Sequence, residues 1–436
     1  MAYGKGTWSG QNKKLPGTYI NFTGEEQVSD IFGDRGKAAM AMTFDWGEDT
    51  SDIFVLTPSQ FNSKCKQMFG YDYNSPQLQP IREVFLGGAT ELYLYRLNAT
   101  GGTAATCEIA TARYKGVRGN DLSIVVTANV DVPSKYDVVT TLDGVSVDKQ
   151  IAVDTDTLED NDFVIFNDPV ESLTAKTYTF STGANAGGEV TAAMHTDFLT
   201  KLSGYNVNCV GCIYATASET PLSTLYANWA IEQRDVYANP IQAVVYNSPS
   251  DHEAVINVDE SLDFVPWFLG AEAGCALNTT IQNKTYNGNY VPTKNYTQAE
   301  LEQTLDEGKI VLHRVGQEYR VLADINSLVT TGTNGKNDEF KENKTIRVID
   351  DIATNICDIF NNGYIGKVAN NEAGRLSFQN QIIVLLDSYV DASVIGPYEK
   401  SEVTCVEGEQ RGSVVVSLAV TLTHMVEKAY VTVVVG

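Results

Sequence analysis

Apolar and polar positions in the first hundred residues predict alternating strands and helices. Ile53–Leu56 is a short apolar run typical of a strand. Thr57 follows it as a candidate helix N-cap, with Pro58 at the first helical position. Apolar residues then recur at three-to-four spacing, which predicts a helix that ends at Gly70. Leucine and tyrosine alternate in Glu91–Leu97, and this pattern predicts a second strand.

Helical periodicity disappears between Gly101-Gly102 and Gly187-Gly188. Short runs rich in valine, isoleucine, threonine and tyrosine predict strands at Leu122–Thr127, Tyr136–Leu142, Val145–Val147, Phe163–Phe166 and Thr177–Phe180. Asp143-Gly144 separates two of these runs and is a two-residue hairpin signal. Strands at this spacing predict a small β-sandwich or barrel, inserted into the α/β part of the chain.

Strands and helices alternate again after residue 188. Helices are predicted at Ala192–Leu202 and from Thr220 to about Val236, and a capping box at Thr297–Glu300 opens another that closes at Gly308. Predicted strands lie at Asn206–Ala215, Ile241–Tyr246, Ile310–His313 and Arg320–Ala323. Strands separated by helices of this length imply a largely parallel sheet that is covered on both faces. The polar stretch Thr330–Asn343 reads as a loop.

The last hundred residues have a different pattern. One helical stripe is formed by Ile346, Ile349, Ala353, Ile356 and Phe360, and a less regular one by Leu376, Gln379, Ile383 and Leu386. Alternation from Ser413 to Thr423 then predicts a strand with Val414, Val416 and Leu418 on one face. Val431, Val433 and Val435 alternate on a final predicted strand.

Both ends of the sequence have features of strands that pair with another chain. The final valine-rich strand carries no charge that would block edge pairing, so it is either buried in its own domain or donated to another subunit. The first residues form a glycine-rich arm with its own β-prone stretch, which includes Thr18, Tyr19, Ile20 and Phe22. Two such ends favour an assembly protein over an enzyme.

The expected fold class is therefore a multi-domain α+β or α/β protein. We expect an N-terminal arm at residues 1–22, a first part of an α/β core at 23–100 and an inserted all-β domain at 101–188. The second part of the core would span 189–335, and a C-terminal α+β assembly domain would span 336–436.

Composition excludes several classes of partner. The chain has 436 residues with 31 basic and 55 acidic side chains, so its formal net charge is 31 − 55 = −24. This balance argues against nucleic-acid binding and against a polybasic membrane surface, because both need clustered cations. No apolar run approaches the roughly 18–20 residues of a membrane helix, and Met1–Gly10 does not resemble a signal peptide. The expectation is an acidic protein made in the cytoplasm, without membrane insertion.

Motifs that would support catalysis or cofactor binding are incomplete. Cys209 and Cys212 form a lone CxxC within a predicted strand, where the two thiols would point to opposite faces as buried, inert side chains. Gly332–Asn337 lacks the glycine spacing and the hydroxyl of a phosphate loop. An acidic cluster at Asp154–Asp162 lacks the glycine of a calcium loop, so we interpret it as a solvated loop.

The histidines also give no site. His195, His252, His313 and His424 are dispersed, and we expect the first two on helix or loop surfaces and His424 on the apolar register of the terminal strand. No Gly-x-Ser-x-Gly nucleophile elbow is present. We therefore assign no catalytic residue, no cofactor and no metal ligand.

An ordered set of segments resembles the contractile tail sheath proteins of bacteriophages and phage-tail-like bacteriocin particles. The segments are Leu15–Phe22, Gly87–Leu97, Ala112–Leu122, Phe268–Gly274, Ile346–Ile365, Gly366–Asn371 and Gly374-Arg375, in family order. The resemblance implies a structural subunit, not an enzyme, that polymerises around a tail tube. Contraction of the sheath would then drive the tube through the target cell envelope.

The resemblance also implies partners and sites. Subunits would stack helically as rings of six around the tail tube protein, with baseplate and tail terminator proteins at the ends. The arms of neighbours would complete a β-sheet through Thr18, Tyr19, Ile20, Phe22, Val414, Val416, Leu418, Val431, Val433 and Val435. A tube-facing helix would present Lys344, Arg347, Asp350 and Asp351. An α/β enzyme of hydrolase-like fold and another self-assembling shell protein stay open as alternatives.

Overall fold

The computed structural model describes residues 4–6, 17–19, 35–48, 51–187, 189–217, 220–332, 335–427, 430 and 432. The chain divides into two compact units, which are described separately. Unit 2 contains residues 35–352, 393–396 and 420–436, and unit 1 contains residues 1–34, 353–392 and 397–419. The boundary falls inside helix α7 (Asn343–Gly363), between Ile352 and Ala353.

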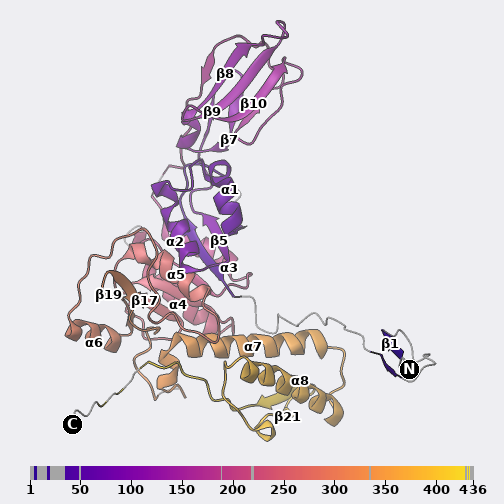
Figure 1. The fold of residues 1–436 in the computed structure, drawn as a ribbon, viewed down its shortest axis with the longest axis vertical. Helices are drawn as coiled ribbons and strands as arrows, with labels where there is room; N and C mark the ends of the chain where they lie inside the picture. The colour runs from indigo at the N-terminus through magenta and orange to yellow at the C-terminus, as the bar shows by residue number, and fades with distance from the viewer. Residues whose placement is uncertain are drawn as a thin grey trace. The chain divides into compact units, whose positions relative to one another are not determined.

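Unit 2 is organised around a seven-stranded sheet with the order β18-β17-β16-β13-β3-β5-β4. Figure 1 labels two of these strands, β5 and β17. The strands are β3 (Lys37–Met42), β4 (Ile53–Leu56), β5 (Glu91–Arg96), β13 (Cys209–Gly211), β16 (Gln242–Tyr246), β17 (Val255–Val258) and β18 (Lys309–Ile310). All neighbours pair in parallel except β4, which is antiparallel to β5. The sequence pattern predicted this largely parallel sheet but not its inner strands β3 and β17. In β3 five consecutive buried apolar residues follow Lys37, so the strand shows no alternation.

Helices cover both faces of this sheet. One face packs against α1 (Pro58–Phe69), α2 (Gln79–Gly87) and α5 (Val265–Ala273), and the other against α3 (Ala192–Leu202) and α4 (Leu222–Asp235). In β3, Ala38 and Met40 belong to the first core, whereas Ala39 and Ala41 belong to the second. The predicted cap of α1 is confirmed, since Thr57 and Gln60 form a capping box and Gly70 ends the helix with φ of 76°.

Helices α2 and α5 are in backbone contact through two glycines. A Cβ atom on Gly270 would lie 1.8 Å from the carbonyl oxygen of Val84, and one on Gly87 would lie 2.3 Å from that of Trp267. Neither position can take a larger side chain without separating the helices. This contact gives a physical reason for the alanine- and glycine-rich segment Phe268–Gly274, which the sequence pattern alone did not identify as a helix.

The inserted segment forms a β-sandwich, as predicted. One sheet has the order β10-β9-β8-β12 and the other β11-β7-β6, and they enclose a shared apolar core. The strands are β6 (Ala104–Thr106), β7 (Ala110–Lys115), β8 (Leu122–Ala128), β9 (Tyr136–Leu142), β10 (Val145–Val153), β11 (Val164–Phe166) and β12 (Thr177–Thr179). Asp143 and Gly144 turn β9 into β10 with φ of 54° and 74°, which confirms the predicted two-residue hairpin.

The sandwich is attached at the carboxyl end of the parallel sheet. The chain enters and leaves it side by side, since Thr103 pairs with Ala184 and Thr106 with Ser181. Buried arginines then join it to the α/β core. Arg96 donates to the carbonyls of Phe44 (3.1 Å) and Lys115 (3.2 Å), and Arg118 donates to that of Gly70 (2.8 Å).

The remaining part of unit 2 differs from the sequence prediction in two places. Asn206–Ala215 was predicted as one long strand, but only Cys209–Gly211 is paired. The predicted strand at 310–313 is divided between the end of β18 and the start of β19 (Leu312–Val315). The predicted strand at 320–323 overlaps β20 (Glu318–Val321), which pairs with β19 in an antiparallel hairpin outside the parallel sheet. Helix α6 (Gln298–Asp306) begins with the predicted capping box at Thr297.

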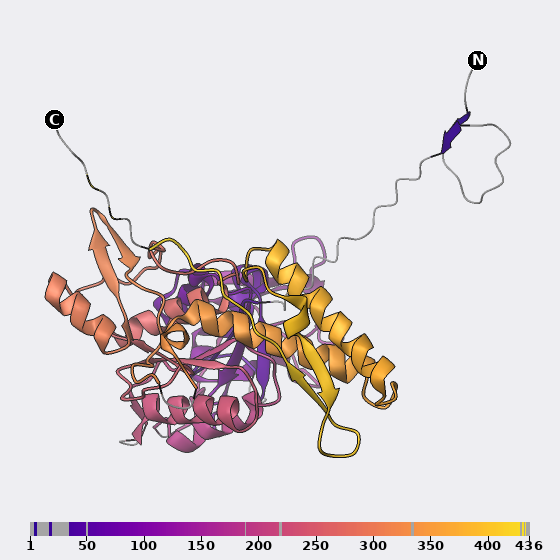
Figure 2. The same ribbon diagram turned by 90° about the horizontal axis from the view of Figure 1, so that it is seen from below.

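Unit 1 contains the second half of α7, helix α8 (Glu372–Asp391) and the hairpin of β21 (Thr404–Glu407) and β22 (Val414–Ser417). Figure 2 shows α8 running alongside this half of α7. Phe378 packs on Phe360 and Tyr364, with ring centroids 5.2 and 4.9 Å apart. The stripe predicted for α8 is only partly right, since Leu376 is 53% exposed whereas Leu386 is buried. The buried side chains of this helix are Phe378, Ile382, Leu385, Leu386 and Tyr389.

Two short strands are described in the N-terminal arm. Gly4–Gly6 (β1) pairs in parallel with Gly17–Tyr19 (β2). Thr18 and Tyr19 therefore lie in a strand, as the β-prone stretch predicted. Ile20, Phe22, Val431, Val433 and Val435 lie outside the described residues.

Candidate assembly surfaces

The β21–β22 hairpin is a small sheet without further paired strands among the described residues. Its register joins Cys405 to Val416 and Val406 to Val415. Val406 and Val415 are 54% and 50% exposed, so this apolar pair faces away from the rest of unit 1. Gln379 of α8 anchors the base of the hairpin by donating to the carbonyl of Val403 at 2.7 Å. Both backbone edges of the hairpin are thus without a further paired strand in the described part of the chain, and such edges can accept one.

The strand predicted from Ser413 to Thr423 is shorter in the structure. Val414, Val416 and Leu418 are half-buried and alternate with the exposed positions 415, 417 and 419, as predicted, but pairing in β22 ends at Ser417. Beyond it, Leu422 forms an isolated antiparallel bridge with Ile395. The outer edge of β22 stays unpaired within the part of the chain that is described.

The four charged residues assigned to a tube-facing helix face the interior instead. Lys344, Arg347 and Asp351 are 6%, 1% and 7% exposed. Asp350 accepts two hydrogen bonds of 2.6 Å from the guanidinium of Arg234 in α4. This half of α7 is committed to contacts within unit 2, so these four residues do not form an exposed surface in the structure.

Arg347 is the centre of a buried charge cluster. Its guanidinium lies 2.6 Å from Glu272 of α5 and 2.7 Å from Asp324. Arg347 and Asp324 attract each other, which holds the pKa of the Asp324 carboxyl at about 2 although burial opposes this. Burial raises the pKa of Glu272 well above its usual range. The cluster ties the start of α7 to the α/β core.

Two further residues complete this cluster. Asn343 donates to Glu272 at 3.0 Å and accepts from Gln242 at 3.1 Å. The sequence pattern did not single out Glu272, although a charge inside the apolar run Phe268–Gly274 signals a buried group that needs a partner.

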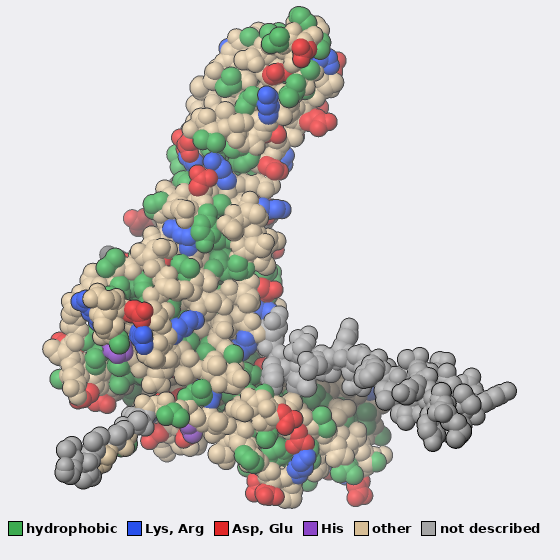
Figure 3. All heavy atoms as spheres, viewed as in Figure 1, with side chains coloured by type: hydrophobic (Ala, Val, Ile, Leu, Met, Phe, Trp, Pro, Cys, Tyr) green, Lys and Arg blue, Asp and Glu red, His purple; other side chains and the backbone are tan. Residues whose placement is uncertain are grey.

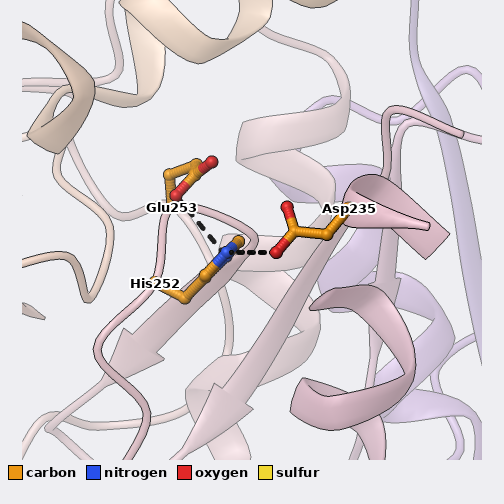
Figure 4. Close-up of side chains that lie close together, drawn as sticks. All are labelled: Asp235, His252 and Glu253. Atoms are coloured by element: carbon orange, nitrogen blue, oxygen red, sulfur yellow. Dashed lines mark hydrogen bonds and ion pairs between the residues drawn. The ribbon is translucent and has the colours of Figure 1, made fainter. Parts of the chain in front are cut away.

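Asp235, His252 and Glu253 form the one group of possible metal ligands found among the described residues (Figure 4). The Nε2 atom of His252 lies 3.1 Å from Asp235, and its Nδ1 atom lies 3.5 Å from Glu253. The two carboxylates therefore face different nitrogens of the ring and do not converge on one of them. Glu253 is also held by Lys336 at 2.6 Å. The geometry fits an ion-paired network that anchors two loops, not a chelating site.

The other sequence motifs have structural roles. Cys209 and Cys212 are buried in the cores on opposite faces of the sheet, as predicted, and burial raises the pKa of each thiol to about 12. Lys336 of the phosphate-loop-like segment pairs with Glu253. In the acidic cluster, Asp154 pairs with Lys135 at 3.3 Å. His195 was expected at a surface, but it is fully buried and bonded through Nδ1 to the hydroxyl of Tyr226 at 2.7 Å.

The order of the parallel strands reverses between β3 and β13, which is where doubly wound sheets bind ligands. Here the backbone amide of Thr43, just after β3, donates to the hydroxyl of Tyr214 at 3.0 Å. The hydroxyl of Tyr214 therefore accepts the hydrogen bond that the Thr43 amide could otherwise donate to a ligand. This contact does not favour the alternative of an α/β enzyme.

Charged side chains of both signs lie on the face of the molecule shown in Figure 3. On the face shown in Figure 3, acidic and basic side chains are interspersed and do not gather into a single patch. No helix among the described residues is long and apolar enough to cross a membrane.

Family models match most of the chain. Residues 100–209 match the phage tail sheath protein beta-sandwich domain, residues 188–327 the phage tail sheath protein central domain, and residues 335–436 the phage tail sheath C-terminal domain. The phage-like element PBSX protein XkdK of Bacillus subtilis (strain 168) is 27% identical over 97% of each chain.

Solved structures share the fold. The sheath tail protein of Desulfitobacterium hafniense is 28% identical, with a TM-score of 0.80 over 95% of this chain and 99% of the other. The helical sheath of the anti-feeding prophage in its contracted state is 11% identical, with a TM-score of 0.54 over 97% of this chain and 99% of the other.

Proposed function

Because this chain belongs to the phage tail sheath protein family, we propose that it polymerises around a tail tube and contracts to drive the tube through a target cell envelope. Its proposed partners are further copies of itself in helically stacked rings of six, the tail tube protein, and baseplate and tail terminator proteins. Assembly would take place in the cytoplasm of the bacterial host, before the sheath becomes part of a virion tail or a phage-tail-like particle.

The open β21–β22 hairpin is the observation that carries this proposal. An extended segment from a second subunit can add to either edge, with main-chain hydrogen bonds supplying affinity. The candidate donors are the stretch from Thr18 to Phe22 and the valine-rich stretch from Val431 to Val435. Such links would persist while subunits rotate, because the paired strands move as one sheet.

We further propose how the chain is divided between these tasks. The arm at residues 1–22 would supply one donor strand, with its glycines as the hinge. Residues 23–100 and 189–335 would form the split α/β core, residues 101–188 the inserted sandwich, and residues 336–436 the assembly domain with its own donor strand. The contracted form of the anti-feeding prophage sheath supports the idea that this fold can serve contraction.

Electron microscopy of the purified full chain tests the proposal. Hollow, ribbed cylinders are expected, whereas a monodisperse small oligomer would favour an enzyme and spheres would favour another shell protein. Deletion of residues 1–22, which removes the stretch from Thr18 to Phe22, or of residues 429–436 should leave folded monomers that no longer form cylinders. If both truncated chains still assemble, strand exchange between subunits is ruled out.

A further inference from the structure

Residues 420–427 are docked on unit 2 before the chain continues into its C-terminal stretch. The amide of Gly396 donates to the carbonyl of Thr421 at 2.7 Å, and the amide of Thr423 donates to that of Val394 at 3.3 Å. Lys344, at the start of α7, donates its ammonium group to the carbonyl of Thr423. We call this docked segment, with the residues that hold it, the C-terminal seat.

His424 lies at the charged end of the seat. Its Nε2 atom is 3.0 Å from Glu339, and its Nδ1 atom is 3.6 Å from Glu342. These two carboxylates come from the segment just before α7, so they approach the imidazole from the core and not from its own segment. The side chains of the three residues are 49%, 44% and 37% exposed, so protons from solvent reach all of them.

The other charged groups at the seat are mostly acidic. A cavity of about 70 Å³ at the seat is lined in part by Asp324, Glu342, Lys344 and Glu427. The groups at the seat that can carry a positive charge are Lys344 and His424, together with Arg347, which lies 2.7 Å from Asp324 in the buried charge cluster. Burial raises the pKa of Glu342, and the carboxylates of Glu427 and Glu339 add to this, whereas His424 lowers it. The negative charge of Glu339, Glu342 and Glu427 is therefore compensated less when His424 is neutral than when it is protonated.

We propose that His424, Glu339 and Glu342 form a pH-sensitive clasp that fixes the root of the C-terminal arm on the α/β unit. An imidazole gains its charge as pH falls from about 8 to about 5. The imidazolium then pairs with both carboxylates and the seat is held. The neutral ring loses these pairs and leaves Glu339, Glu342 and Glu427 to repel one another. Residues 420–427 then detach more often from the rest of unit 2.

The size of the effect is limited by solvent. Because exposed ion pairs are weak, two of them change the opening equilibrium of the seat by about threefold to tenfold. The clasp would thus adjust the position and reach of the arm without unfolding the unit. Its value for assembly rests on the proposed function, since a fixed root directs the donor strand toward a neighbouring subunit.

Hydrogen exchange of the full-length chain measures the seat directly. Deuterium uptake of the peptide that contains Thr421 and Thr423 is followed at about pH 6 and about pH 8.5, with rates corrected for intrinsic exchange, at a concentration where light scattering detects no polymer. In the unmodified chain, protection should fall about threefold to tenfold at the higher pH. His424→Gln should show the lower protection at both pH values, and His424→Lys the higher protection at both.

His313→Gln serves as the control, because His313 lies on β19 and outside the seat. It should keep the pH response of the unmodified chain. Equal protection of the seat at both pH values, or a His424→Gln chain that responds like the unmodified one, would overturn the clasp. Because the measurement uses unassembled chains, its failure leaves strand exchange intact, and failure of the chain to form cylinders leaves the clasp intact.

Discussion

The guanidinium of Arg347 lies 2.6 Å from the carboxylate of Glu272, with the two side chains 1% and 0% exposed. The pair joins α7 to α5, and Asp324 completes it from the loop that follows β20. A buried ion pair of this kind contributes little net stability compared with an apolar contact, yet it is costly to break on one side. It therefore fixes where α7 starts on the core.

Replacement of Arg347 by methionine should destabilise unit 2 strongly. Two carboxylates would stay buried without their main cation, and the free energy of unfolding should fall by about 3–5 kcal/mol. Urea denaturation followed by tryptophan fluorescence measures this, because Trp46 and Trp267 are buried in unit 2. Arg314→Met, at an exposed position of β19, is the matched control and should change stability by less than about 0.5 kcal/mol. A loss below about 1 kcal/mol for Arg347→Met would contradict the bridging role.

Gly270→Ala should separate α2 from α5. The added methyl group would lie 1.8 Å from the carbonyl oxygen of Val84, so one helix must move and leave packing defects beside β13. We expect a loss of about 2–3 kcal/mol in the free energy of unfolding. Gly363→Ala is the control, since its Cβ would have no neighbour within 4 Å and alanine favours the helix. Unchanged stability of the Gly270 variant would show that the helices do not touch here.

Stability should decrease as pH falls from about 6.5 toward 4 because of His195. Burial lowers the pKa of this imidazole from 6.5 to about 4, so below pH 6.5 the unfolded chain binds a proton that the folded chain excludes. Among the described residues, the Nε2 atom of His195 has no hydrogen-bond partner, which adds to the cost of protonation. At pH 5 the difference amounts to about 2 kcal/mol. Urea denaturation at pH 7.5 and at pH 5 measures the loss in the free energy of unfolding between the two pH values. This loss should be smaller by about 2 kcal/mol for His195→Gln than for the unmodified chain.

Proline in the last valine-rich stretch should block assembly without unfolding the chain. Backbone amides of adjacent strand residues point to opposite edges of the strand. One of the two variants Val433→Pro and Val434→Pro must therefore remove a hydrogen-bond donor from the proposed pairing with another subunit. Sedimentation should then show monomers with unchanged thermal unfolding. Val433→Thr and Val434→Thr keep β propensity and should still give cylinders. Assembly by both proline variants would argue that this stretch is not donated.

Local signals in the sequence predicted most elements but not their partners. Thr57, Asp143-Gly144 and Thr297 each fix a cap or a turn by themselves, and the structure confirms all three. Strand β3 was not predicted because it is apolar on both faces and so lacks periodicity. The end of pairing at Ser417 was not predicted either, because it is set by the partner strand. Ser417 pairs with Thr404, where β21 begins, and β propensity beyond that point cannot supply a partner.

The candidate surfaces were predicted only in part for a related reason. The alternation of Val414, Val416 and Leu418 is visible in sequence, because it depends on local geometry. The burial of Lys344, Arg347, Asp350 and Asp351 is not, because it depends on Glu272, Asp324 and Arg234, which lie far away along the chain. Charged residues on a helix are normally exposed to solvent. Here ion pairs with residues distant in sequence allow them to be buried.

The β-sandwich begins and ends at adjacent positions in space, so it can be replaced as a whole domain. Because Thr103 lies beside Ala184, the segment between them begins and ends at one point, and another compact domain could be grafted there without stretching the core. This domain could therefore be exchanged as a unit in evolution, while the parallel sheet and the β21–β22 hairpin keep their sequence constraints.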